Sequence, residues 1–223
     1  MLKIRYYRLR LPPGIGINSV ESSAYKLASS SGISVLRAAA DELIVRYTST
    51  RHIETIQILS DGSEVKTSIP TMEQYSLRFF QTNTDVLLSL LDPPRGLRIT
   101  SEVLGLLLGQ GNYFIETLEI SSALIKRHIE IFDSVKLVSA KIRDFKVYEN
   151  AIGRLEIGSK DGLSDEIAPF LAGKYYKTDS LTYEVTHQFQ RGLICYSSNG
   201  TVRVSGPLVE IAFPTFELQI MHQ

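Results

Sequence analysis

Short segments in which polar and apolar residues alternate recur along this chain, and this pattern constrains its fold most. In residues 181–189, for example, Tyr183, Val185 and His187 alternate with polar neighbours. Alternation with a period of two predicts strands that have one buried face. The expected strands are residues 2–11, 42–48, 52–59, 64–69, 134–148, 152–158, 181–189, 192–197, 201–205 and 209–220, the last bent at Pro214.

Two turn signals indicate how these strands connect. Asp61-Gly62 and Ser198-Asn199-Gly200 both contain pairs that favour the tight turns of β-hairpins. A first strand, a helix and then a meander of strands follow one another in the first hundred residues. This order is typical of an α+β fold and not of alternating βαβ units.

Three or four short helices complete the predicted fold. Asn18 is the expected N-cap of the first helix, with Glu21 in the capping-box position and Gly32 as its C-terminal stop. Residues 100–109 are apolar nearly all round and predict a buried helix. A further short helix is expected after Ser164.

The segment 112–132 fits two interpretations. Ser122 can cap a helix that buries Leu124 and Ile125, whereas a period of two would place Ile125 on a strand face with Ile129. We favour the helix. The fold class predicted from sequence is therefore α+β, with mostly antiparallel sheets and three or four short helices.

The strongest interruption in the chain is Asp92-Pro93-Pro94-Arg95-Gly96. It predicts a boundary between an N-terminal βα-meander subdomain, 1–94, and a C-terminal strand-rich α+β subdomain, 95–223. The sequence leaves open whether this segment separates two domains or only turns a loop.

Composition gives few hints of a partner. Lysine plus arginine and aspartate plus glutamate number 24 each, so no global field attracts a polyanion. The single cysteine, Cys195, permits no intramolecular disulfide and fits a reducing compartment. No apolar run approaches the ~18–20 residues that span a bilayer. We therefore expect a cytoplasmic protein without a membrane partner.

One loop has features of an anion site. Gly14 and Gly16 lie between a strand and a helix, followed by Asn18 and Ser19. A helix N-terminus offers free N–H groups to a phosphate. The third glycine of a dinucleotide fingerprint is absent, however, and so is the lysine of a P-loop. A structural turn is the favoured interpretation.

Basic residues interleaved with aromatic residues form a second candidate site. The residues expected to bind are Arg5, Arg78, Lys141, Arg143 and Phe145. Arginine and aromatic side chains on one sheet face can hold single-stranded nucleic acid. We expect Lys141 and Arg143 to share a strand face with Phe145, although a solvated face of mixed charge explains the pattern as well.

No sequence motif indicates a nucleophile, a metal or a cofactor. The four histidines lack metal-ligand spacing, and His187 is the most plausible acid–base residue if the protein is an enzyme. The leading hypothesis is a non-enzymatic binding or assembly module that uses a strand-rich surface to bind a protein partner or a second copy. Single-stranded nucleic-acid binding is the first alternative, and a small enzyme is the second.

Overall fold

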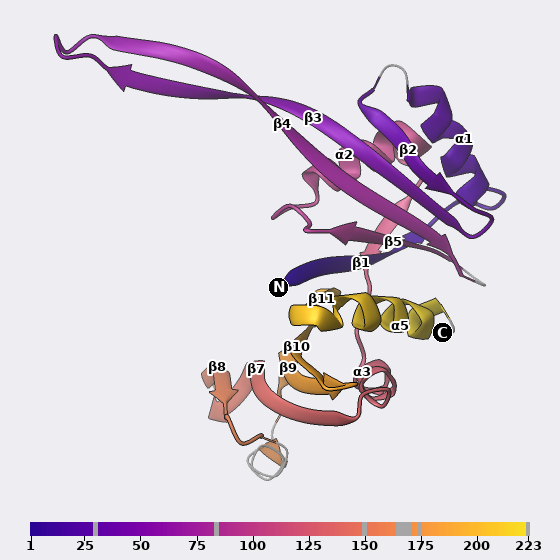
Figure 1. The fold of residues 1–223 in the computed structure, drawn as a ribbon, viewed down its shortest axis with the longest axis vertical. Coiled ribbons are helices and arrows are strands. Elements are labelled where there is room, and N and C mark those ends of the chain that lie inside the picture. The colour runs from indigo at the N-terminus through magenta and orange to yellow at the C-terminus, as the bar shows by residue number, and fades with distance from the viewer. Residues whose placement is uncertain (29–30, 83–84, 149–150, 164–170, 174, 222–223) are drawn as a thin grey trace.

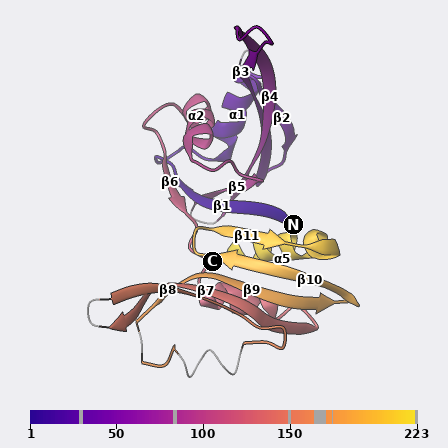
Figure 2. The ribbon, with the colours of Figure 1, turned by 90° about the vertical axis from the view of Figure 1, so that its left-hand side faces the viewer.

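The computed structural model describes residues 1–28, 31–82, 85–148, 151–163, 171–173 and 175–221, and it confirms the α+β class. Within these ranges, eleven antiparallel strands form one sheet in the order β2-β3-β4-β5-β1-β11-β10-β9-β7-β8, with β6 also paired to β1 (Figures 1 and 2). The strands are β1 (Leu2–Arg10), β2 (Ile33–Ala38), β3 (Glu42–Ile58), β4 (Glu64–Gln81), β5 (Val86–Leu91), β6 (Phe114–Thr117), β7 (Ser134–Tyr148), β8 (Ala151–Gly158), β9 (Lys177–His187), β10 (Gln190–Ser197) and β11 (Thr201–Val204). The helices are α1 (Ile17–Leu27), α2 (Arg98–Leu108), α3 (Ser122–Ile129) and α5 (Val209–Met221), the last preceded by a 3₁₀ turn, η1 (Gly206–Leu208).

Strand β1 lies at the centre and contributes to two hydrophobic cores on opposite faces of the sheet. Tyr7 and Leu9 belong to an N-terminal core beneath α1 and α2, whereas Tyr6 belongs to a C-terminal core beneath α3 and α5. Successive strand residues point to opposite faces, so adjacent tyrosines enter different cores. Strand β1 pairs with β5, which precedes the Asp92–Gly96 segment, and with β11, which follows it, so the strands before and after this segment form one continuous sheet. The predicted boundary between 1–94 and 95–223 remains a prediction.

Helix α1 begins earlier than expected, so the predicted capping box is wrong. Its N-cap is Gly16, and Asn18 lies inside the first turn without a capping hydrogen bond. Ile17 is buried in the N-terminal core, which draws the start of the helix toward the sheet. Gly32 lies beyond the end of α1 in the left-handed region, where a Cβ would come within 2.4 Å of the Thr48 carbonyl oxygen.

The expected C-terminal strand, 209–220, is wrong, because this segment forms α5. Its buried residues, Ala212, Phe213, Phe216, Glu217 and Ile220, recur with helical spacing and face the C-terminal core. Apolar residues are so frequent in this segment that they also fit the two-residue period of a strand, which explains the wrong prediction. Pro214 is exposed, so its ring does not disturb the buried face.

The favoured helix in the ambiguous segment is confirmed as α3, and its cap lies one residue earlier than expected. The Ser121 hydroxyl accepts a hydrogen bond from the Leu124 backbone N–H at 3.2 Å. The helix expected after Ser164 lies outside the described residues. No helix in the described ranges is long and apolar enough to cross a bilayer.

Strands β3 and β4 are far longer than predicted. The segments expected as two strands, 42–48 and 52–59, form the single 17-residue strand β3, and β4 runs through Pro70 to Gln81. Strand β2 pairs with β3 only as far as Tyr47, and β5 pairs with β4 only from Leu77. The two strands therefore continue alone as a ribbon that projects from the body (Figure 1). We call residues 50–72 the arm.

Candidate functional site

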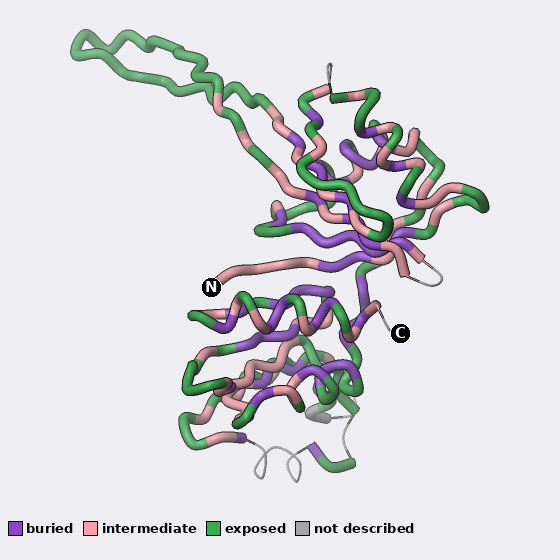
Figure 3. The backbone as a smooth tube through the Cα atoms, turned by 45° about the vertical axis from the view of Figure 1, so that its right-hand side comes forward, coloured by how far each residue is buried: buried purple, intermediate pink, exposed green. Residues whose placement is uncertain are grey.

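The arm exposes an unusual amount of apolar surface. Its exposed apolar side chains, between 41% and 71% accessible, are Ile53, Ile56, Ile58, Leu59, Val65, Ile69 and Met72. Figure 3 shows the arm exposed over nearly its whole length. Large apolar groups that gather on a protruding element are typical of interaction sites.

The apolar side chains lie on both faces of the arm. The cross-strand pair Ile53 and Ile69 lies on one face, and Ile56, Ile58 and Met72 lie on the other. Both outer edges also lack a neighbouring strand among the described residues. The arm can therefore contact a partner through two faces and through two rows of backbone groups.

Local polar contacts shape the arm. The tip turns at Asp61, whose carboxylate accepts hydrogen bonds from the Ser63 backbone at 2.9 Å and from its hydroxyl, and these bonds lower the pKa of Asp61. The Thr55 hydroxyl donates to the Thr67 carbonyl at 3.2 Å. An isolated two-stranded ribbon is only marginally stable in water, so these contacts maintain a shape that few tertiary contacts support.

A second surface lies on the C-terminal half of the sheet. Helices α3 and α5 pack on one face of β11, β10, β9 and β7, and no described helix covers the other, which we call the open face. One row of register partners across it contains Lys3, Arg203, Cys195, Thr182 and Ser139. Figure 2 shows these strands stacked one below another, with α3 behind them.

The open face is rich in positive charge. Register and exposure place on it Lys3, Arg5, Lys136, Lys141, Arg143, Arg154, Lys177, Arg191 and Arg203. Three carboxylates oppose them and each has an ion-pair partner, Glu156 with Lys141 at 2.7 Å, Glu184 with Arg191 and Asp144 with Lys177 at 3.3 Å. The zero net charge of the chain therefore conceals a local excess of cations.

Three of the predicted binding residues lie on the open face, namely Arg5, Lys141 and Arg143. The expectation that Phe145 shares their face is wrong. A bulge at Asp144, whose φ is 55°, inserts an extra residue into β7. Phe145 is consequently buried with Ile142, away from solvent.

The fifth predicted residue, Arg78, lies on the other face of the sheet in an ion-pair network. Its guanidinium contacts Glu42 and the buried Glu217 of α5, and the Tyr6 hydroxyl donates to Glu217 at 3.2 Å. Burial raises the pKa of Glu217, although Arg78 opposes the shift. Because the network joins α5 to β3 and β4, it holds the two halves together and leaves Arg78 poorly placed for a ligand.

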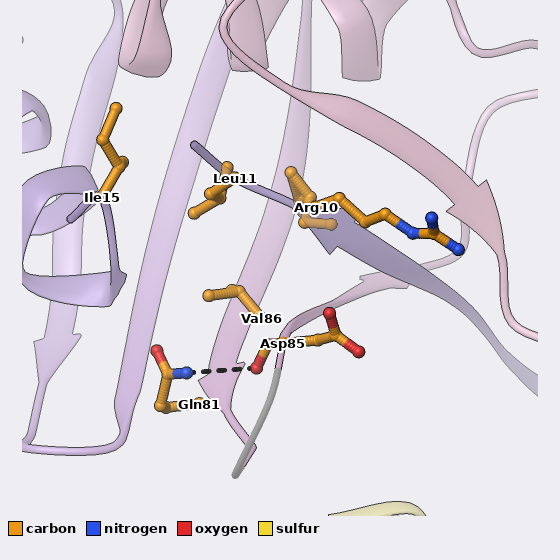
Figure 4. Close-up of a pocket in the computed structure, with 7 residues that line it drawn as sticks. Arg10, Leu11, Ile15, Gln81, Asp85 and Val86 are labelled. Atoms are coloured by element: carbon orange, nitrogen blue, oxygen red, sulfur yellow. Dashed lines mark hydrogen bonds between the residues drawn. The ribbon is translucent and has the colours of Figure 1, made fainter. Parts of the chain in front are cut away.

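The loop from Gly14 to Ser19 borders two surface hollows. The one in Figure 4 has a volume of about 270 Å³ and is lined by Leu9, Arg10, Leu11, Ile15, Gln81, Asp85 and Val86. Its charged groups have ion-pair partners, Arg10 with Glu116 at 3.0 Å and Asp85 with Arg8 at 3.3 Å. Neither pair leaves a free cation for an anion, and the anion role of Gly14, Gly16, Asn18 and Ser19 stays a prediction.

Sequence reasoning did not identify the buried polar centre of the C-terminal core. His128 is fully buried, with Nδ1 bonded to the Tyr196 hydroxyl and Nε2 to Thr215 Oγ1 at 3.0 Å. Thr215 donates to the Ile211 carbonyl at 2.7 Å, so Nε2–H is the donor and Nδ1 the acceptor. Burial lowers the pKa of His128 to about 4. Only its position on the buried face of α3 could have suggested this role.

His187, the proposed acid–base residue, contacts the Phe132 ring edge to face, and its Nδ1 is buried without a hydrogen-bond partner. Among the described residues, no group of three His, Cys, Asp or Glu side chains is arranged to hold a metal ion. The enzyme hypothesis gains no support from this geometry.

Comparison with known proteins adds no family assignment. No protein-family model matches the chain, and no curated protein is similar to it in sequence. The functional argument therefore depends on the arm and on the open face.

Proposed function

We propose that this chain is a non-enzymatic assembly module whose arm packs against a protein surface, with a second copy of the chain as the first partner to test. The observation that carries the proposal is the apolar side chains on both faces of the arm, including Ile58 at 71% exposure. Fully burying such a side chain contributes roughly 1.5–3 kcal/mol.

Charge supports a protein partner for the arm. Within residues 50–72, Arg51 and Lys66 are outnumbered by Glu54, Asp61 and Glu64. This balance disfavours a polyanion. The zero formal charge of the whole chain also leaves no net repulsion between copies.

An arm-shortened variant tests the proposal. Ser49 and Glu73 are register partners, so an Asn-Gly turn can replace residues 50–72 while the base of both strands remains. We expect light scattering to show a defined oligomer for the full chain and a monomer for the shortened chain. Hydrogen exchange should show arm amides that become protected as concentration rises.

Point variants test the two faces separately. Ile56→Ser with Ile58→Ser alters one face of the arm, and Ile53→Ser with Ile69→Ser alters the other. The matched control, Leu106→Ser with Leu218→Ser, removes exposed apolar groups from helices. A full chain that stays monomeric at all concentrations, with unprotected arm amides, would contradict self-association.

A further inference from the structure

The open face carries like charges directly opposite one another, and this arrangement requires an explanation. Lys3 faces Arg203 across β1 and β11, and Arg143 faces Lys177 across β7 and β9. Like charges in directly opposed positions destabilise a sheet. Lys177 is offset by Asp144 at 3.3 Å, whereas Lys3, Arg203 and Arg143 form no ion pair with described residues.

The surface between these two cationic groups is hydroxyl-rich. Thr182 and Ser139 lie in the row of Lys3 and Arg203, and the next row contains Ser197 and Ser180 between Arg5 and Lys141. Serine and threonine hydroxyls, together with arginine and lysine, are the side chains that contact phosphate oxygens. From β1 to β7 the band crosses four strand spacings, or about 19 Å of sheet at about 4.8 Å per spacing.

We infer that the open face binds single-stranded nucleic acid through its phosphate backbone. The ligand crosses the strands from Arg203 to Arg143, and its phosphates neutralise the opposed cations. Exposed rings lie at the Arg143 end, where Tyr175 and Tyr176, 63% and 38% accessible, immediately precede Lys177. Such rings can stack on unpaired bases, which a duplex does not present.

This site is separate from the arm. The arm is net acidic and extends from β3 and β4, whereas the open face is formed by β1, β11, β10, β9, β7 and β8. The two binding activities can therefore fail independently. The arm-shortened variant should retain its full affinity for oligonucleotides.

The test is fluorescence anisotropy with labelled oligo-dT and oligo-U of about 20 nucleotides, long enough for a site of about 4–16. We expect binding at about 50 mM salt that weakens steeply toward 200 mM. Arg143→Glu with Arg203→Glu should weaken binding at least tenfold. Loss of two phosphate contacts should reduce the salt slope by about 1.4.

A matched control separates the site from the net charge. Lys26→Glu with Arg95→Glu makes the same change in charge at exposed positions elsewhere and should leave affinity within about twofold. Arg143→Thr and Arg203→Thr should weaken binding while thermal stability is kept or raised, because like-charge repulsion is relieved. Loss of fold then cannot explain the loss of binding.

Three outcomes would overturn the inference. They are no oligonucleotide binding at low salt, an equal loss of binding in the control variant, and equal affinity for a duplex of the same length.

Discussion

The two halves of the sheet are built differently although they share β1. The N-terminal half buries one face beneath α1 and α2 with apolar side chains, and it extends the arm into solvent. The C-terminal half buries the opposite face beneath α3 and α5, where the core also encloses His128 and Glu217. Each half exposes a different kind of surface, which is apolar in the arm and cationic on the open face. One continuous sheet can therefore present two chemically distinct surfaces.

The largest expected effect tests whether the halves are independent. Phe79 in the N-terminal core and Phe216 in the C-terminal core are both fully buried. We expect Phe79→Ala and Phe216→Ala each to cost about 3–5 kcal/mol. Because β1 contributes to both cores, chemical denaturation should show one shared transition in both variants. Two separate transitions, only one of them shifted by each variant, would instead support two subdomains.

The next largest effect is a pH dependence of stability that comes from His128 in the C-terminal core. The pKa of His128 is about 4 in the folded state against 6.5 for an unperturbed histidine, so below pH 6.5 the unfolded chain binds the proton more strongly. The shifted pKa of His128 therefore contributes about 3 kcal/mol to the free energy of unfolding above pH 6.5, and this contribution is lost as pH falls toward 4. Unfolding free energies measured between pH 7 and 5 should fall in the wild type. His52→Gln, on the exposed arm, should leave this profile unchanged.

A smaller effect compares one tyrosine from each half. Tyr6 donates to Glu217, which is 5% exposed, whereas Tyr47 donates to the exposed Glu102 at 2.7 Å. Tyr6→Phe should cost about 1–2 kcal/mol because Glu217 cannot regain water, and Tyr47→Phe should cost less than about 1 kcal/mol. Urea titration of both variants measures the difference. Equal losses would show that burial of the acceptor does not matter here.

The smallest effect on stability is expected in the arm. Ile58→Ser should change the unfolding free energy of the monomer by less than about 0.5 kcal/mol, because the side chain is 71% exposed. The same substitution should weaken self-association, measured by light scattering. A large loss of monomer stability would mean that the arm packs on its own chain.

Much of the secondary structure followed from local patterns. The helices α2 and α3 and the hairpin from β10 to β11 were predicted near their observed positions, because turn residues and apolar spacing act within a few residues. The predictions failed where contacts between distant segments, and not the local pattern, decide the structure. Segment 209–220 satisfied two periods at once, and only the C-terminal core selected the helix. The bulge at Asp144, which reversed the direction of Phe145, has no clear signal in the residues around it.

The candidate sites likewise contain some features that local sequence shows and others that depend on the tertiary structure. Arg5, Lys141 and Arg143 could be proposed from sequence because basic residues interleaved with aromatic residues are visible locally. The sequence could not show that these residues share one sheet face with Lys3 and Arg203, since that depends on the register between strands far apart in the chain. The arm was also missed, because apolar and polar residues alternate at the buried base and at the exposed tip of β3 alike, and alternation does not show whether a face is covered.

By itself, the sequence determined an α+β chain with many antiparallel strands, a few short helices and no charge excess, because these properties depend on composition and local periodicity. Tertiary structure decided which strand ends acquire neighbours and which faces acquire helices. Burial depends on those neighbours. That is why Val45 is enclosed by β2 and α1 while Ile58, in the same strand, remains in solvent.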